Sequence, residues 1–111
     1  MVKFMVYLLS TVWFPPVKGE EVGKKFLEVA KKYPEDKSLG KTVLAGALMR
    51  TSIGIKAITI FEVKKGKLDA ALERVGDILG AYSEIEGVNS RVDTMATLVE
   101  SLDAIGLKVP E

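Results

Sequence analysis

The segment TVLAGALMRTSIGIKAITIFEV, residues Thr42–Val63, restricts the fold more than any other part of the sequence. It reads as two β-strands that turn near residues 51–54, and apolar side chains occupy both alternating faces of each strand. A sheet with one face in water alternates apolar with polar residues, and this segment does not. Both faces of the predicted sheet therefore need a cover.

The rest of the chain supplies two further strands and three helices at regular intervals. Apolar residues at helical spacing predict the helices, and Pro15, Pro16 and Pro34 end the elements before them. The predicted order is strand Val2–Phe14, helix Glu20–Tyr33, the hairpin Thr42–Val63, helix Lys67–Ser83, strand Gly87–Asp93 and helix Thr94–Ile105. This βαββαβ order with a short C-terminal helix is the α+β, ferredoxin-like plan, in which two helices cover one face of an antiparallel sheet. The first and third strands are the most apolar, so we expect them at the centre.

The residue types that the chain lacks exclude more functions than the residue types that it contains indicate. The 111 residues predict a single domain, residues 1–111, with a net charge of +1 that provides no long-range attraction for nucleic acid or anionic lipid. The chain has no cysteine and no histidine, which excludes thiolate chemistry and removes the commonest near-neutral acid–base group and metal ligand. No uncharged run approaches the roughly 20 residues of a membrane helix. We expect a cytoplasmic protein without cofactor, metal, nucleic-acid partner or membrane partner.

The second sheet face is the main structural question. Two helices cover only one face, and the economical cover for the other is the same face of a second copy, packed about a two-fold axis. The alternative is that the C-terminal helix folds across this face within one chain. We expect a homodimer or a higher even oligomer.

The strand order, the opening VYLLSTVWFPP and the two-sided apolar hairpin resemble the dimeric α/β-barrel superfamily. The resemblance implies sheets packed face to face in a dimer and a ligand pocket between sheet and helices. Members include cofactor-free monooxygenases, small-ring isomerases and decarboxylases, haem-dependent peroxidases and stress-responsive proteins. The haem branch commonly uses an axial histidine, which this chain lacks.

Five residues are candidates for binding a ligand. Tyr7 and Trp13 share one face of the first strand and add a polar group to an apolar wall, although core or dimer-interface aromatics would show the same pattern. Glu62 is expected close to Trp13, and Arg91 and Asp93 share one face of an edge strand. If Glu62 or Asp93 pointed into a helix-side pocket, it would act as a proton acceptor or an anchor. The alternative is that edge-strand charges prevent aggregation.

The other sequence motifs either do not match a known type of site or allow two interpretations. SLGKT lacks the first glycine of a phosphate-binding loop, because Glu35 stands there, and an RNA-recognition sheet would need more than Phe61 on its central strands. Gly23, Gly76 and Gly80 interrupt the two long helices, which indicates either close helix–sheet packing or space for a ligand.

Three functions remain. The first is a homodimeric small-molecule-binding protein of the dimeric α/β-barrel type. The second is a cofactor-independent monooxygenase or isomerase that acts on a small apolar or aromatic substrate. The third is a structural or assembly subunit. A pocket between the sheet and the helices would favour the first two, and a solid core would favour the third.

Overall fold

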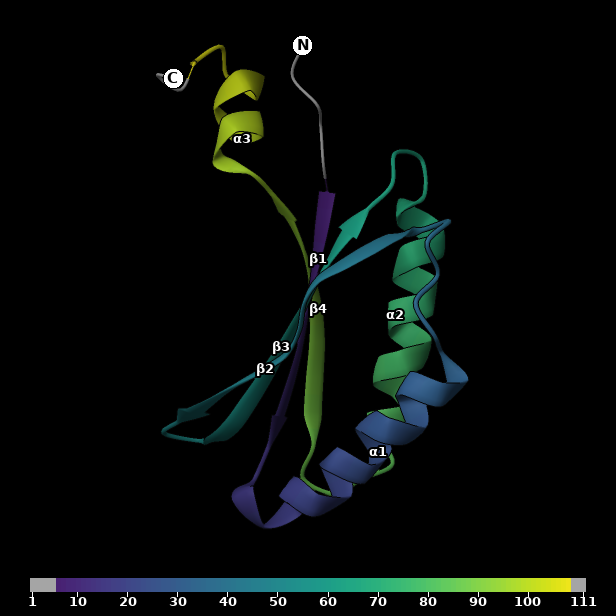
Figure 1. The fold of residues 1–111 in the computed structure, drawn as a ribbon. Coiled ribbons are helices and arrows are strands. Elements are labelled where there is room, and N and C mark those ends of the chain that lie inside the picture. The colour runs from purple at the N-terminus through teal and green to yellow at the C-terminus, as the bar shows by residue number, and fades with distance from the viewer. Residues whose placement is uncertain (1–5, 109–111) are drawn as a thin grey trace.

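The computed structural model describes residues 6–108 and shows a four-stranded sheet with helices (Figure 1). The elements follow one another as β1 (Val6–Phe14), the 3-10 helix η1 (Pro16–Lys18), α1 (Gly19–Lys32), β2 (Gly40–Thr51), β3 (Gly54–Val63), α2 (Leu68–Tyr82), β4 (Asn89–Ala96) and α3 (Leu98–Ala104). The expected order is confirmed. The part of the first predicted strand before Val6 lies outside the described residues.

All strand pairs are antiparallel, and the strand order across the sheet is β2-β3-β1-β4. The two most apolar strands are therefore central and the two others are edges, as the sequence predicted. In the β1–β3 register Leu8 lies opposite Phe61, and in the β1–β4 register it lies opposite Thr94. Strand β2 is irregular between Thr42 and Ala47, where its register against β3 shifts.

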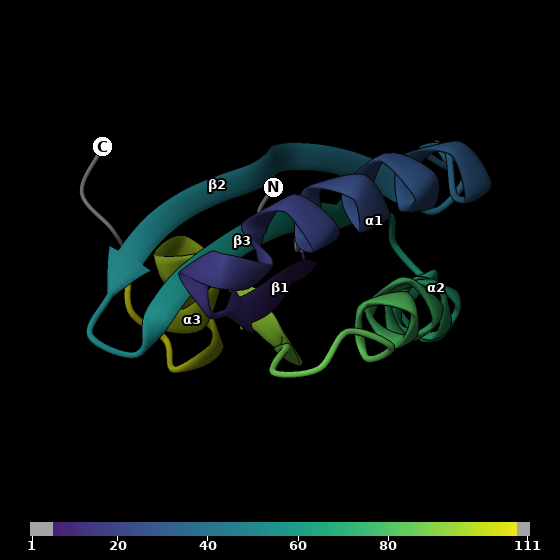
Figure 2. The same ribbon diagram turned by 90° about the horizontal axis from the view of Figure 1, so that it is seen from below.

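Helices α1 and α2 both lie on one side of the sheet (Figures 1 and 2). Acidic side chains in the first turn of α1 and lysines in its last turn suit the helix dipole. The core forms where α2 meets the central strand, and its centre is Leu8, which is fully buried. The core residues are Leu8, Val12, Phe14, Val22, Val29, Val63, Ala71, Val75, Leu79, Tyr82 and Ile85.

The C-terminal third departs from prediction in one place. Strand β4 continues to Ala96 instead of ending at Asp93, and α3 begins at Leu98 instead of Thr94. Pairing with β1 explains the extension, because Thr94, Met95 and Ala96 lie opposite Leu8, Tyr7 and Val6. The hydroxyl of Thr97 then accepts a hydrogen bond from the Glu100 backbone N–H at 3.2 Å, which makes Thr97 the helix N-cap.

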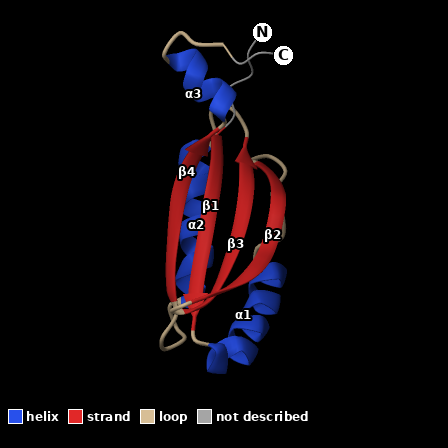
Figure 3. Cartoon of the chain, turned by 90° about the vertical axis from the view of Figure 1, so that its left-hand side faces the viewer, coloured by secondary structure: helices blue, strands red, loops and turns tan. Residues whose placement is uncertain are grey.

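Within residues 6–108, no helix covers the face of the sheet turned away from α1 and α2, as Figure 3 shows. Helix α3 stands beyond the end of the strands and does not cross this face, so the alternative in which the chain's own C-terminal helix covers the face is wrong. We call this surface the open face. The strand registers place on it more apolar than polar side chains. The apolar ones are Tyr7, Leu9, Trp13, Leu44, Ala47, Met49, Ile58, Ile60 and Met95, and the polar ones are Thr11, Lys41, Lys56, Glu62, Asn89, Arg91 and Asp93.

Candidate functional site

A cavity of about 540 Å³ lies between the sheet and the two long helices. It exists because α1 makes its close contacts with α2 and η1, whereas α2 is the helix that packs against β1 and β4. The space under α1 is therefore not filled by side chains. We call it the helix-side cavity. Its volume falls in the range of roughly 300–1,000 Å³ that is usual for small-molecule sites.

The cavity wall is largely apolar and comes from five elements. Strands β1 and β3 supply Val12, Phe14, Ala57 and Phe61, and helices α1 and α2 supply Val22, Phe26, Val29, Ala71, Val75, Ile78 and Leu79. The alternation of β1 puts Val12 and Phe14 on the helix side, and Ser10 follows the same alternation. A ligand that fits this wall must itself be mostly apolar.

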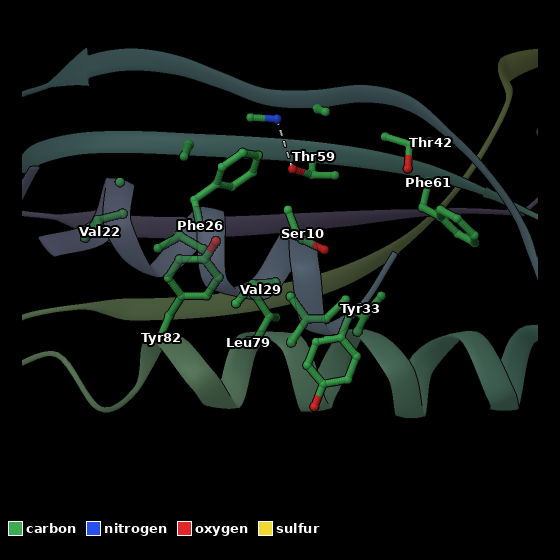
Figure 4. Close-up of a pocket in the computed structure, with 18 of the residues that line it drawn as sticks. Ser10, Val22, Phe26, Val29, Tyr33, Thr42, Thr59, Phe61, Leu79 and Tyr82 are labelled. Carbon is green, nitrogen blue, oxygen red and sulfur yellow. Dashed lines mark hydrogen bonds between the residues drawn. The ribbon is translucent and has the colours of Figure 1, made fainter. Parts of the chain in front are cut away.

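Hydroxyl groups provide most of the polarity inside the cavity. In Figure 4 the side chains of Ser10, Phe26 and Tyr82 point into the space between the sheet and α2. The Thr59 hydroxyl already accepts a hydrogen bond from the Gly46 backbone N–H at 3.1 Å. Burial raises the pKa of the Tyr82 hydroxyl, which keeps it protonated and able to donate a hydrogen bond.

Two charged side chains, Glu35 and Arg74, border the cavity: Glu35, in the loop between α1 and β2, binds β2, and Arg74 of α2 binds this loop. The Glu35 carboxylate accepts a hydrogen bond from the Thr42 backbone N–H at 2.6 Å, which lowers the pKa of this carboxyl. The Arg74 guanidinium donates to the Pro34 carbonyl and lies 6.0 Å from the centre of the Tyr33 ring. These contacts hold the loop that closes one end of the cavity.

The opening of the cavity lies between α1 and the edge strand β2. Seven wall residues are exposed to solvent, and they come from these two elements and the loop that joins them: Gly23, Phe26, Ala30, Glu35, Thr42, Ala45 and Leu48. Phe26 of α1 lines the cavity and is 45% exposed. The reason is that α1 stands off the sheet, so Phe26 meets the cavity and solvent instead of a packed layer.

The helix glycines Gly23, Gly76 and Gly80 are all exposed. A Cβ atom added at Gly23, Gly76 or Gly80 would meet no heavy atom within 4 Å. Close helix–sheet packing therefore does not explain these glycines. Gly23 lines the cavity, so space for a ligand is the interpretation that fits this position.

All five sequence-predicted candidates lie on the open face, away from the helix-side cavity. Tyr7 lies opposite Glu62 on β3, and Trp13 lies opposite Lys56, whose ammonium group is 5.8 Å from the centre of the indole. The expected proximity of Glu62 to Trp13 is wrong, because β1 and β3 run antiparallel and place these residues toward opposite ends of the sheet.

The charges among the candidates are paired on the open face. Arg91 and Asp93 form an ion pair on β4 with 2.8 Å between guanidinium nitrogen and carboxylate oxygen, and Glu62 lies 3.9 Å from the Lys41 ammonium group. A role of Tyr7, Trp13, Glu62, Arg91 and Asp93 in ligand binding stays a prediction, and the structure places it on this surface.

Sequence reasoning missed Ser10 as a cavity residue, although a signal was present. Ser10 is the polar member of the alternating set Leu8, Ser10, Val12 and Phe14, which otherwise faces the core. A hydroxyl at such a position needs a partner, a water molecule or a ligand.

Neither metal binding nor a membrane-spanning helix has support in residues 6–108. Within this range, no three or more Asp or Glu side chains are grouped to hold a metal ion. In the same part of the chain, none of the helices combines the length and apolar character needed to cross a membrane.

Comparison with known proteins identifies the fold. No protein-family model matches the chain, and no curated protein matches it. A dimeric ferredoxin-like protein from an uncultured marine organism superimposes with a TM-score of 0.56 at 12% identity, covering 86% of this chain and 97% of that one. A putative antibiotic biosynthesis monooxygenase from Caulobacter crescentus CB15 gives 0.51 at 16% identity, over 86% and 92%.

A designed protein, Foldit4, is similar to the same extent, with a TM-score of 0.53 at 11% identity and coverage of 86% and 99%. At these identities the likeness concerns the fold. The expected resemblance to dimeric α/β-barrel proteins is confirmed at that level: the chain has a ferredoxin-like α+β fold, shared with a dimeric protein and a putative monooxygenase.

Proposed function

We propose that the protein is a homodimer that binds a small, neutral and largely apolar molecule in the helix-side cavity. The observation that carries this proposal is the cavity itself: about 540 Å³, apolar on most of its wall, with the hydroxyls of Ser10 and Tyr82 directed into it. A ligand with an aromatic or aliphatic body and one hydroxyl or carbonyl group matches this wall.

The charge distribution favours a neutral ligand. The two charged side chains at the cavity, Glu35 and Arg74, already bind backbone groups, Glu35 the Thr42 N–H of β2 and Arg74 the Pro34 carbonyl. An anionic ligand would lose its hydration and gain no dedicated cation in return. The same observation favours binding over catalysis, since neither charged group is free to act on a substrate in the cavity.

The open face supports the dimer. It is a broad surface of mainly apolar side chains that the chain's own helices leave uncovered (Figure 3). An apolar patch of this kind marks an interaction site. The second copy is the partner of choice, because identical open faces are complementary in character and pack about a two-fold axis in the plane between them.

Titration with 2-naphthol, followed by calorimetry, tests the ligand-binding part. We expect saturable binding of one molecule per chain with a Kd on the order of 1 mM or tighter, and much weaker binding of the anion 2-naphthoate. Two matched variants locate the site. Ala30→Leu adds bulk at the cavity mouth, and Ala70→Leu adds the same bulk at an exposed position of α2 outside the cavity.

The two variants give opposite expectations. Ala30→Leu should weaken 2-naphthol binding several-fold, and Ala70→Leu should leave it unchanged. Absence of saturable binding by the wild-type protein, or equal effects of the two substitutions, would show that the cavity is not the binding site.

A further inference from the structure

Helix α3 is specified by strong local signals at both ends. Thr97 caps its N-terminus through the bond to the Glu100 N–H. At its C-terminus, Gly106 takes a positive φ of 82°, its N–H donates to the Asp103 carbonyl at 3.0 Å, and the Leu107 N–H donates to the Leu102 carbonyl at 2.8 Å. These two bonds form a Schellman motif, which ends the helix at a defined residue. Local signals in the sequence therefore specify both ends of this short helix.

The helix is short and leaves several apolar side chains exposed, although its Glu100 is buried. Its seven residues fall well below the roughly 12–15 that an isolated helix needs in water. Yet Leu98 is 69% exposed and Ile105 is 70% exposed, and Val99 and Leu107 are exposed as well. Among residues 6–108, the close packing contacts between elements all join η1, α1, α2 and the four strands, and α3 is not among them. A capped apolar helix in this position requires a surface to cover it.

The position of α3 indicates which surface that is. The helix stands beyond the ends of β1 and β4, displaced from the sheet toward the side of the open face and away from α1 and α2 (Figures 1 and 2). In a dimer built from two open faces, this is the side on which the partner lies. Helix α3 then projects past its own sheet toward the partner chain.

The interface area gives an independent argument. Four strands about 4.8 Å apart and nine residues of about 3.3 Å rise, the length of β1, give an open face on the order of 600 Å². A stable protein interface buries roughly 800 Å² on each partner. The exposed apolar side chains at α3, which follows directly after β4, supply further apolar surface.

We propose that α3 is an exchanged element: in the dimer each α3 packs its apolar side chains against the sheet of the partner chain. This inference rests on the proposed homodimer and adds the residues that complete its interface. Leu98, Val99, Ile105 and Leu107 then become buried, and the helix is stabilised by the partner chain.

Point substitutions in α3 test the inference without disturbing the isolated chain. Leu98→Asp and Ile105→Asp replace side chains that the single chain leaves exposed, so the chain should still fold. Ser101→Asp is the matched control, since Ser101 is an exposed polar residue of the same helix. We expect the dimer dissociation constant, measured by sedimentation, to rise roughly tenfold or more for the two test variants and to stay within about threefold for the control.

Hydrogen exchange provides a second readout. The α3 amides should be protected at concentrations where the protein is dimeric and should lose protection on dilution to the monomer, while α2 stays protected. If the wild-type protein is dimeric but both α3 substitutions leave the dissociation constant unchanged, or α3 stays protected in the monomer, the exchange of α3 is wrong and the homodimer stands. A wild-type protein that is monomeric overturns the homodimer and the exchange together.

Discussion

Replacing the helix glycines by alanine should stabilise this protein. Alanine is favoured over glycine in a helix interior by about 1 kcal/mol, and glycine is retained where a side chain would collide with something. Here an added Cβ at Gly23, Gly76 or Gly80 meets no heavy atom within 4 Å. We therefore expect each substitution to raise the free energy of unfolding by about 0.5–1 kcal/mol.

The gain is measurable by urea denaturation and by thermal unfolding. For a chain of this length, an increase of that size raises the melting temperature by roughly 2–5 °C. Wild type and variants should be compared at one protein concentration, because dimerisation contributes to the apparent stability. Gly76→Ala and Gly80→Ala together should give about twice the single effect if the two positions act independently.

Gly23→Ala and Gly76→Ala form a matched pair for function. Both should stabilise the fold, but only Gly23 lines the helix-side cavity. A methyl group at Gly23 should weaken 2-naphthol binding, and one at Gly76 should not. The reasoning is refuted if the alanine variants are destabilised by more than about 0.5 kcal/mol, since that result would mean the helices pack where the structure shows space.

Three further predictions concern single side chains. Leu8→Ala should cost about 2–5 kcal/mol of unfolding free energy, measured in urea, because Leu8 is fully buried between α2 and the sheet; a loss below 1 kcal/mol would contradict its place in the core. The pKa of Glu35 is lowered from 4.5 by its bond to the Thr42 N–H, so wild type should lose stability as the pH falls through and below 4.5, and Glu35→Gln should lose less over that interval; identical acid unfolding profiles would show that the bond does not form. Burial raises the pKa of Tyr82 above 10.0, so wild type should lose stability as the pH rises past 10, and Tyr82→Phe should retain more of it; equal alkaline profiles would argue against the buried hydroxyl.

The sequence was sufficient for the element order and the strand arrangement. The two-sided apolar hairpin and the apolar first strand predicted β1 and β3 at the centre, because a central strand is covered on both faces and paired on both edges. The helix predicted to end at Ile105 ends there for a local reason, since Gly106 follows with a positive φ of 82°.

The boundary between β4 and α3 depended on tertiary pairing. Residues 94–96 have helical spacing with the residues after them, but the edge of β1 offers backbone partners that keep them in the strand. The register between the strands was the other feature that the sequence did not predict. Whether Glu62 lies near Trp13 or near Tyr7 depends on strand direction, which side-chain alternation does not reveal.

The sequence predicted the kind of site, a pocket, but not the residues that line it. A pocket between sheet and helices was expected, and the helix-side cavity lies there. The aromatic and charged residues selected from the strands lie on the other face, since the two faces of β1 are nearly equally apolar and the choice between them depends on where the helices pack. Ser10 was the polar position of β1 that indicated the helix side of the sheet, where it lines the cavity.

Equilibrium sedimentation of the wild-type protein at micromolar concentration tests the central claim most directly. The open face of the sheet is mainly apolar and has no cover within residues 6–108, and we assign that cover to a second copy. We therefore expect a species of twice the 12.1 kDa chain mass. A stable species of 12.1 kDa would contradict it.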